Sequence, residues 1–187
     1  MRLASFSVSG HEGFGIVTDD GIIELTGRLS GRQQTLRDAL EADVLEEAAQ
    51  ISLDADVDYG HGDVEWRLPV PDPEKIYCVG QNYAAHITEM GYELPEYPSI
   101  FARFPRTFVP HHGSMVMPSH SEHFDYEGEL TIVIGTEARH VSEADAFNYV
   151  AGYTVCNDGS VRDWQKRGPQ VAPGKNWEYS GMLGPWI

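Results

Sequence analysis

The sequence predicts an α+β protein that is mainly β, with a small N-terminal α+β domain followed by a larger domain. Short apolar, β-branched stretches recur along the 187 residues and are separated by glycine-containing turns, a pattern typical of strands. A longer helical pattern, from Thr35 to about Gln50, stands in the first part. Prolines at positions 69, 71 and 73 mark a boundary, because proline interrupts regular structure. We therefore expect domains at residues 1–70 and 71–187.

The first domain is predicted to contain three short strands and one helix. The strands are Leu3–Val8, Gly15–Thr18 and Ile22–Leu25, which are separated by glycine and Asp-Asp-Gly turns. Thr35 has the hydroxyl that suits a helix N-cap, and the apolar side chains after it follow helical spacing. The polar and acidic segment Leu53–Asp63 is predicted to be a loop.

The second domain is predicted to be richer in strands. Four segments have the apolar pattern of strands: Lys75–Gly80, Ser99–Arg103, Glu127–Thr136 and Val150–Cys156. Residues 184–187, Gly-Pro-Trp-Ile, look like the start of a further buried strand, whose edge would need a partner. We therefore expect this domain to be incomplete at its C-terminal end.

Short helices are expected between these strands. One runs from about Tyr83 to Met90 and ends at Gly91, where a C-cap glycine belongs. Another begins at Ser142, because Asp145 follows three residues later in a variant of the capping box. A third is expected after the Asn-Asp-Gly-Ser sequence at residues 157–160.

Charge and hydropathy exclude several classes of function. The net charge of −16 argues against binding to nucleic acid or to anionic membranes, because both need clustered lysine or arginine. No apolar run approaches the length of a membrane span. The first residues look like a strand and lack the basic end and apolar stretch of a signal peptide. We therefore expect a cytoplasmic protein.

The cysteines and histidines are not expected to form a metal centre. Cys78 and Cys156 stand alone within apolar strand patterns, so we predict reduced, buried thiols. Four histidines, at positions 111, 112, 120 and 123, precede the Glu127 strand and raise the alternative of zinc. Zinc sites have tighter spacing on a defined element, whereas these histidines lie in a proline-rich segment.

The most informative feature is the pair of carboxylates at the start of the predicted Glu127–Thr136 strand. Side chains at i and i+2 of a strand share a face, so Glu127 and Glu129 are predicted to lie side by side at the mouth of a buried strand. Two like charges this close resist ionising together unless a cation lies between them. Oxygen ligands favour a hard divalent ion, Mg²⁺ or Mn²⁺, with Ca²⁺ as a substitute. The alternative is a solvated pair on an exposed edge strand.

Two further acidic positions extend this hypothesis. Asp158 directly follows the Val150–Cys156 strand and, with the two glutamates, would complete a three-carboxylate site open to water and substrate. Asn-Asp-Gly alone is also a turn signal. His86 and Glu89 are three residues apart and share a helix face, where the carboxylate would raise the basicity of the imidazole. The alternative there is an ordinary surface ion pair.

These motifs together resemble the fumarylacetoacetate hydrolase family. Residues 79–89, Val-Gly-Gln-Asn-Tyr-Ala-Ala-His-Ile-Thr-Glu, are similar to its Gly-x-Asn-Tyr-x-x-His-x-x-Glu signature. Residues 125–130, Asp-Tyr-Glu-Gly-Glu-Leu, resemble its metal-binding strand, and residues 150–165 and 174–176 resemble its next two motifs. Residues 1–70 more loosely resemble the small domain of many bacterial members. The resemblance implies a mixed β-sandwich roll and an enzyme that acts on 2-oxo acids as a hydrolase, isomerase or hydratase.

The resemblance also implies ligands for the metal and a nearby cation. Glu127, Glu129 and Asp158 would bind Mg²⁺ or Mn²⁺. Lys175 would lie near the metal and act in catalysis by stabilising negative charge on the substrate.

The remaining matched residues would contact the substrate or activate water. His86 and Glu89 would form a catalytic dyad on a lid-like helix. Arg103, Arg162 and Gln165 would line the substrate pocket.

The chemistry of such a site favours cleavage of a C–C bond. A 2-oxo acid can chelate one metal ion through its carboxylate and keto oxygens, and the metal with Lys175 would stabilise an enolate. For a 2,4-dioxo acid, water activated by His86 would attack the distal carbonyl and release pyruvate and a carboxylic acid. We therefore predict a homodimeric, metal-dependent hydrolase of acylpyruvate-type 2,4-dioxo acids that acts in aromatic-compound catabolism.

Two alternatives stay open at this point. The same enolate-stabilising site could serve an isomerase, hydratase or decarboxylase on a related 2-oxo acid, since fold and metal site alone do not choose the reaction. The chain could also be a truncated, non-catalytic metal-binding relative.

Overall fold

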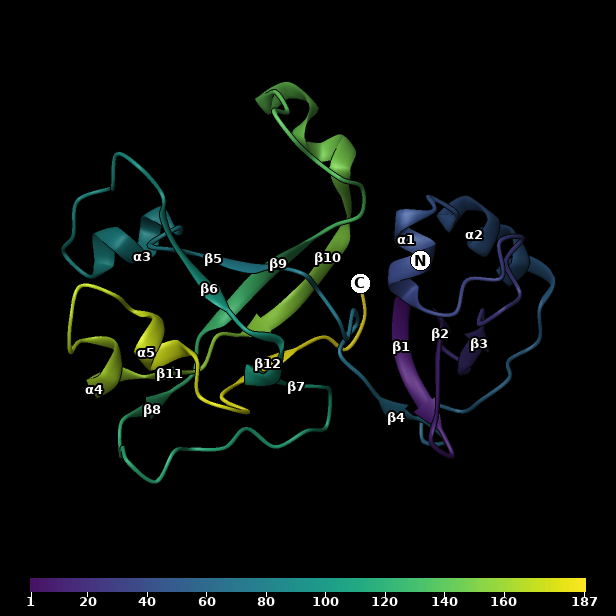
Figure 1. The fold of residues 1–187 in the computed structure, drawn as a ribbon, viewed down its shortest axis with the longest axis horizontal. Coiled ribbons are helices and arrows are strands. Elements are labelled where there is room, and N and C mark those ends of the chain that lie inside the picture. The colour runs from purple at the N-terminus through teal and green to yellow at the C-terminus, as the bar shows by residue number, and fades with distance from the viewer.

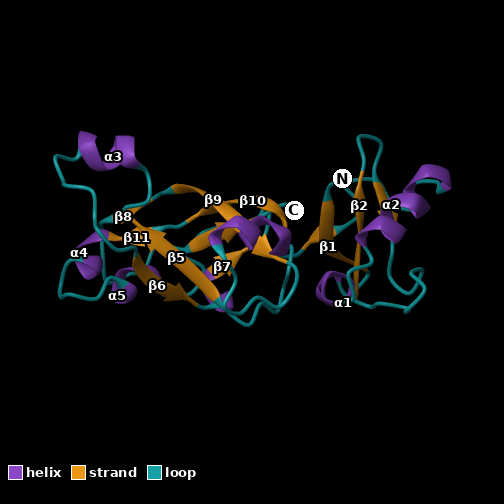
Figure 2. Cartoon of the chain, turned by 90° about the horizontal axis from the view of Figure 1, so that it is seen from above, coloured by secondary structure: helices purple, strands orange, loops and turns teal.

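The computed structural model describes residues 1–187, which form two modules side by side (Figures 1 and 2). The N-terminal module is built on a four-stranded sheet with the order β3-β2-β1-β4. Its strands are β1 (Leu3–Val8), β2 (His11–Val17), β3 (Ile22–Glu24) and β4 (Glu65–Trp66). The sequence predicts the first three of these, whereas the two-residue β4 is too short to give an alternating pattern.

The helical segment of this module differs from the single helix that the sequence predicts. It forms two helices, α1 (Leu36–Glu41) and α2 (Leu45–Asp54), which are separated by Ala42–Val44. Asp43 has a φ of 53°, in the left-handed region, so the chain leaves the helix there. The N-cap prediction is confirmed, because the Thr35 hydroxyl accepts a hydrogen bond from the Asp38 N–H in a capping box.

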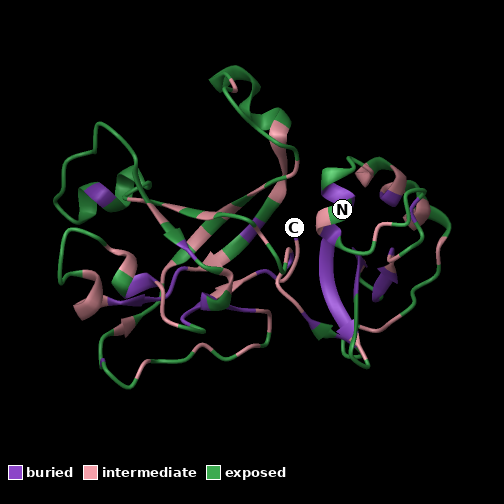
Figure 3. Cartoon of the chain, viewed as in Figure 1, coloured by how far each residue is buried: buried purple, intermediate pink, exposed green.

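Apolar burial holds this module together. The largest core cluster joins the inner face of the sheet to both helices and contains 11 buried residues, among them Phe14, Leu25 and Leu36. Figure 3 shows β1 buried along its length. The last residue of the chain, Ile187, belongs to the same cluster, and its backbone exchanges two hydrogen bonds with Leu3, of 2.8 and 2.9 Å. The Gly-Pro-Trp-Ile segment therefore pairs with the N-terminal module.

The second module contains another four-stranded sheet, with the order β7-β12-β10-β9. Its strands are β7 (Phe108–Val109), β9 (Gly128–Ile134), β10 (Val150–Asn157) and β12 (Gly181–Leu183). The long β9 and β10 pair antiparallel, and β12 pairs antiparallel with β10 but parallel with β7.

Two small antiparallel sheets and three short α-helices complete the second module. The sheets are β5 (Ile76–Gly80) with β6 (Ser99–Arg103), and β8 (Phe124–Asp125) with β11 (Ser160–Val161). The helices are α3 (Ala84–Glu89), α4 (Arg162–Gln165) and α5 (Ala172–Lys175). Two 3₁₀ helices span Pro105–Thr107 and Glu143–Tyr149.

The second 3₁₀ helix stands where the sequence predicts an α-helix. Ser142 does cap it, because its hydroxyl accepts a hydrogen bond from the Asp145 N–H at 3.3 Å. None of the residues in this segment is buried, so no apolar stripe packs against the rest of the protein to extend the helix.

The prediction that the Glu127 strand is buried is wrong, because one face of β9 is exposed and the other is only half-buried. Along β9 the side chains alternate, and Leu130, Ile132 and Ile134 are 61%, 50% and 57% exposed. On β10, Tyr153 and Val155 pair with Ile132 and Leu130 and are also exposed. The apolar sequence of this strand therefore does not produce a buried face on both sides of the sheet.

No helix in the structure is both long and apolar enough to cross a membrane.

Candidate metal and substrate site

Two strand ends bring the predicted carboxylates together. Glu127 stands just before β9 and Asp158 just after β10, and the antiparallel register opposes Gly128 to Asn157. The Asp158 N–H donates to the Glu127 carbonyl at 2.9 Å, and the Asn157 side-chain oxygen accepts from the Glu127 N–H at 3.1 Å. These two hydrogen bonds hold the Glu127 and Asp158 backbones together at the same end of the β9–β10 pair.

Lys175 occupies the space between the two carboxylates. It is the last residue of α5, and its Nζ lies 2.7 Å from Glu127 Oε2 and 2.7 Å from Asp158 Oδ2. The residue is only 2% exposed. A buried ammonium needs such partners, because an unpaired charge in the interior is strongly unfavourable. The structure thus brings Lys175 next to two of the three predicted carboxylate ligands.

Arg103 lies behind Asp158, away from solvent. Its side chain is 0% exposed, and Nη1 donates to Asp158 Oδ1 at 2.6 Å. The family resemblance implies that Arg103 lines the substrate pocket, whereas its guanidinium is enclosed by Asp158, Thr107 and Ser180. Arg103 ends β6, and its guanidinium carbon lies 4.5 Å from the ring centroid of Phe108.

Helix α4 supplies a third cation, Arg162, at the rim of the site. Arg162 pairs with Glu127 Oε1 at 2.5 Å and with Asp125 Oδ2 at 2.9 Å, and its Nη1 also donates to Gln165 Oε1 at 3.0 Å. The Arg162 side chain is 31% exposed, so it remains accessible to a ligand. The buried Ser160 hydroxyl lies 3.0 Å from Glu127 Oε1 and adds a further polar contact.

The three carboxylates differ in their charge environments. Burial alone would raise the pKa of Glu127, but the hydrogen bonds and charges of Lys175 and Arg162 outweigh burial and lower it below its ordinary value. The pKa of Glu129 is raised, mainly by burial and then by the negative charges of Glu127 and Asp158, against the lowering effect of Tyr83. Glu129 is therefore the carboxylate whose negative charge is least compensated.

The donor set fits a hard divalent cation. No three His, Cys, Asp or Glu side chains are already arranged as a metal-binding group. Glu127 and Asp158 share the Lys175 ammonium, and the negative charges of both contribute to the raised pKa of Glu129. A set of three carboxylates offers only oxygen ligands, which Mg²⁺, Mn²⁺ and Ca²⁺ prefer.

His86 and Glu89 lie on α3 and form a pair of their own. His86 Nδ1 is 3.6 Å from Glu89 Oε2, and the two side chains are 67% and 80% exposed. Neither side chain forms a hydrogen bond to Glu127, Glu129 or Asp158. One contact connects their helix to the site: the hydroxyl of Tyr83, the N-cap residue of α3, accepts a hydrogen bond from the Leu130 N–H of β9 at 3.2 Å.

Two glycines permit the close approach of these elements. A Cβ on Gly159 would lie 2.0 Å from the Ser180 carbonyl oxygen, so any side chain would push the segment after Asp158 away from β12. A Cβ on Gly174 would lie 2.5 Å from backbone atoms of Gln165, so glycine lets α5 pack against α4. The sequence motifs contain both glycines, but their role depends on distant segments and could not be inferred locally.

The two cysteines lie close enough to the charged residues for Asp158 and Arg103 to affect the pKa of both thiols, and Cys156 pairs with Glu129 across the sheet. Burial raises the pKa of both Cys78 and Cys156 to about 12, so the thiols stay protonated at neutral pH. His111 packs edge-on against Trp66, and His120 stacks on Trp177.

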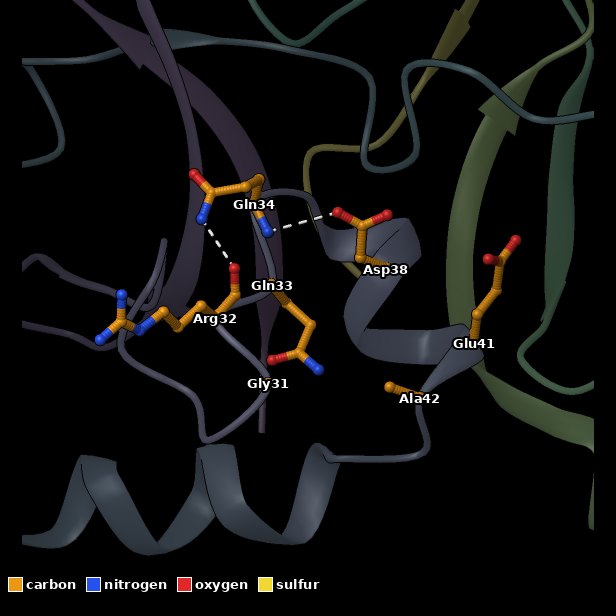
Figure 4. Close-up of a pocket in the computed structure, with 7 residues that line it drawn as sticks. All are labelled: Gly31, Arg32, Gln33, Gln34, Asp38, Glu41 and Ala42. Carbon is orange, nitrogen blue, oxygen red and sulfur yellow. Dashed lines mark hydrogen bonds between the residues drawn. The ribbon is translucent and has the colours of Figure 1, made fainter.

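A separate hollow of about 410 Å³ lies on the N-terminal module and is lined by residues 31–34, 38, 41 and 42 (Figure 4). It contains none of the predicted site residues. A second hollow, of about 290 Å³, lies between β5 and α3 and is lined by Gly80, Ile87 and Leu94 among others.

Comparison with known proteins defines the family. Residues 75–187 match the profile of the fumarylacetoacetate (FAA) hydrolase C-terminal domain. The chain belongs to this family. Human mitochondrial oxaloacetate tautomerase FAHD2A is 34% identical over 193 aligned residues, which include 99% of this chain. Oxaloacetate tautomerase YisK of Bacillus subtilis is 43% identical over 133 residues, covering 68% of this chain and 44% of that protein.

Solved structures of the family confirm the predicted fold class, α+β and mainly β. The crystal structure of an HpcE-type protein from Mycobacterium smegmatis superposes on 100% of this chain with a TM-score of 0.80 and 28% identity. The fumarylacetoacetate hydrolase of Exiguobacterium antarcticum gives a TM-score of 0.77 and 27% identity. The chain spans 66% of each of these structures and 62% of human FAHD2A, less than the full length of its relatives.

Proposed function

We propose that the protein acts on a small 2-oxo acid at a Mg²⁺ or Mn²⁺ centre held by Glu127, Glu129 and Asp158. The observation that carries this proposal is the buried Lys175 ammonium, 2.7 Å from both Glu127 and Asp158. It places positive charge between two of the three carboxylates, and the third, Glu129, has a raised pKa. When bound, the metal would supply Lewis-acid stabilisation of negative charge on the substrate oxygens.

The protein groups around this centre suit a substrate that becomes an enolate. Lys175 can donate a hydrogen bond to the enolate oxygen, and its burial strengthens that interaction because water does not compete. Arg162 is partly exposed at the rim and can pair with the substrate carboxylate, and Gln165 can orient the Arg162 guanidinium through their hydrogen bond. These roles require the substrate to displace part of the ion-pair arrangement around Glu127.

The reaction that this arrangement supports best is keto–enol tautomerisation of a 2-oxo acid. One C3 proton leaves, the keto oxygen gains a proton, and no bond to carbon is hydrolysed, so the reaction needs only enolate stabilisation and a proton carrier. Human FAHD2A and Bacillus subtilis YisK, which match 99% and 68% of this chain, are both named oxaloacetate tautomerases. A 2-oxo dicarboxylic acid of that type is therefore the proposed substrate class.

Hydrolysis of an acylpyruvate is the second candidate, and the His86–Glu89 pair favours it. In that reaction His86 would take a proton from water, the water oxygen would attack the distal carbonyl, and the C3–C4 bond would break to give a carboxylic acid and pyruvate enolate. Both side chains are exposed here, so α3 would have to move toward the carboxylates for this chemistry. A relative from Salmonella dublin is named a bifunctional isomerase/decarboxylase, which keeps those reactions as further alternatives.

Two variants test the proposal. Glu127→Gln keeps the size of the side chain but removes its charge, so Mg²⁺-dependent turnover should be lost while the fold changes little. Activity equal to wild type in this variant would contradict the metal assignment. His86→Ala should block acylpyruvate cleavage but leave oxaloacetate tautomerisation, measured by the loss of enol absorbance, nearly unchanged.

The quaternary state is also a proposal. We infer a homodimer, supported by the exposed apolar residues of β9 and β10, since large exposed apolar patches usually mark interaction sites. Light scattering of the purified chain after size-exclusion chromatography measures the mass directly, and a monomer at all concentrations would contradict it.

A further inference from the structure

Arg103 is a fully buried cation that lies where several elements of the second module meet. It ends β6, and its contacts reach Thr107 in the first 3₁₀ helix, Asp158 after β10 and Ser180 before β12. The last two partners are 55 and 77 residues away in the sequence. The guanidinium therefore joins segments that no continuous strand connects.

Each side of the guanidinium has its own acceptor. Nε donates to Thr107 Oγ1 at 3.2 Å, Nη1 to Asp158 Oδ1 at 2.6 Å and to the Gly159 carbonyl at 3.3 Å, and Nη2 to Ser180 Oγ at 2.8 Å. The planar fork of arginine can satisfy acceptors on three sides at once, whereas the single ammonium of lysine cannot reach all of them.

The two hydroxyl partners are already committed as acceptors. Thr107 Oγ1 donates its own hydrogen to the Phe104 carbonyl at 2.7 Å, and Ser180 Oγ donates to the Trp177 carbonyl at 2.7 Å. Their lone pairs are thus fixed toward Arg103. Space is also limited, because a Cβ on Gly181 would lie 2.9 Å from Arg103 Nη2. The guanidinium has one orientation that satisfies all of these groups.

This orientation determines how the Asp158 carboxylate is presented. Arg103 holds Oδ1 on the buried side, and Oδ2 faces Lys175 at 2.7 Å. Lys175 also balances the charge of Glu127, whereas the charge contacts of Arg103 are confined to Asp158. Arg103 therefore acts on the geometry of one carboxylate.

We propose that Arg103 is a positioning residue, which orients Asp158 for metal binding and does not contact the substrate. The inference rests on the proposed function, because it assigns Asp158 as a metal ligand. Groups that orient a ligand typically change metal affinity about 10–100-fold when they are replaced. The site would therefore lose affinity for the metal if the fork were removed, even with the positive charge retained.

The test is direct titration of the full chain with Mn²⁺ by calorimetry. Arg103→Lys keeps the charge but loses the fork, and Ser180→Ala keeps Arg103 but removes one acceptor, in case the first variant does not fold. Arg106→Lys is the matched control, since Arg106 is 75% exposed and pairs only with Glu178. Thermal unfolding and the affinity of the Mn²⁺-loaded chain for oxalate, a chelating dianion, are measured on the same samples.

We expect Arg103→Lys to weaken Mn²⁺ binding about 10–100-fold, Ser180→Ala to weaken it less, and the control to match wild type. At saturating Mn²⁺, oxalate affinity should stay within about twofold of wild type. Unchanged Mn²⁺ affinity overturns the inference, whether thermal stability falls, as for a merely structural residue, or oxalate affinity falls, as for a substrate contact. If the wild-type chain itself binds no Mn²⁺, the proposed function fails and the inference fails with it.

Discussion

Each of the two modules is stabilised by burying a different kind of side chain. In the N-terminal module the buried side chains are mostly apolar, with Phe14 and Leu36 at 1% and 0% exposure. In the second module the most deeply buried large side chains include Arg103 and Lys175, while apolar residues of β9 and β10 face solvent. The difference shows that the second module uses its interior for a charged site, and that such a centre depends on complete pairing to remain stable.

Removing one buried cation should produce the largest effect. Lys175→Met removes the cation that Glu127 and Asp158 share and leaves each carboxylate with a single arginine partner. Breaking a buried ion pair in this way costs about 3–5 kcal/mol. Hydrogen exchange should show lost protection in β9, β10 and β12 and retained protection in β1–β3. Lys75→Met is the control, because the Lys75 side chain is 65% exposed. Equal loss in both modules would contradict the distinction between them.

Removing an apolar side chain from the N-terminal core should destabilise that module and leave the charged site unchanged. Leu36→Ala opens a cavity in the N-terminal core and should lower the free energy of unfolding by about 2–5 kcal/mol. Mn²⁺ affinity, measured by titration below the unfolding temperature, should not change. Leu53→Ala removes the same atoms from a side chain that is 73% exposed and should change stability little. A fall in Mn²⁺ affinity for Leu36→Ala alone would show that the site depends on the N-terminal core.

The charged site should also respond to pH. The pKa of Glu129 is raised above its ordinary value of 4.5, so a proton competes with the metal at this carboxylate and Mn²⁺ affinity should fall as pH drops toward that pKa. Tyr83 lowers the pKa of Glu129, so Tyr83→Phe should move the midpoint to higher pH. Tyr126→Phe, at a side chain that is 78% exposed, serves as the control. A midpoint that moves to lower pH would contradict this assignment.

The same carboxylates have opposite effects on folding. Glu127 has a lowered pKa, so its contribution to stability is complete above the ordinary value of 4.5 and is lost as pH falls through its folded-state pKa. Glu129 has a raised pKa, so its contribution is complete below 4.5 and is lost as pH rises through its folded-state pKa. Chemical denaturation of Glu127→Gln and Glu129→Gln across this range should separate the two.

The smallest effect is expected on the exposed apolar face. Leu130→Thr replaces one β-compatible side chain by another at a position that is 61% exposed, so stability should change by no more than about 0.5 kcal/mol. Chemical denaturation measures it. A loss comparable to that of Leu36→Ala would show that β9 is covered in solution, and light scattering would then report whether a second copy covers it.

Local patterns were sufficient for most elements but not for their environment. The strands at 3–8, 76–80, 99–103, 128–134 and 150–157 follow the apolar stretches from which they were predicted. The break between α1 and α2 was not predicted, because the left-handed Asp43 lies inside a run with helical spacing. Neither was the exposed face of β9, because the pattern of apolar residues reports alternation and not what covers each face.

For the site, too, local patterns identified residues but not what surrounds them. The residue types and spacing indicated Glu127, Glu129 and Asp158, and the family resemblance added Lys175, which the structure brings between two of the carboxylates. The burial of Arg103 could not be predicted, because its partners lie in distant segments whose approach depends on the assembled sheets. Ser180 gave no signal at all, since a lone serine before a strand has many ordinary roles.

The charge distribution has a kinetic consequence. Net charge is −16, while Arg103 and Lys175, two of the cations at the site, are enclosed by protein. An approaching anion is therefore repelled at long range and meets attraction only within the last few ångströms. Added salt shortens the reach of the repulsion to roughly 8 Å at physiological ionic strength, while buried pairs are screened much less. The encounter rate with a dicarboxylate should then rise with ionic strength, the reverse of electrostatic steering.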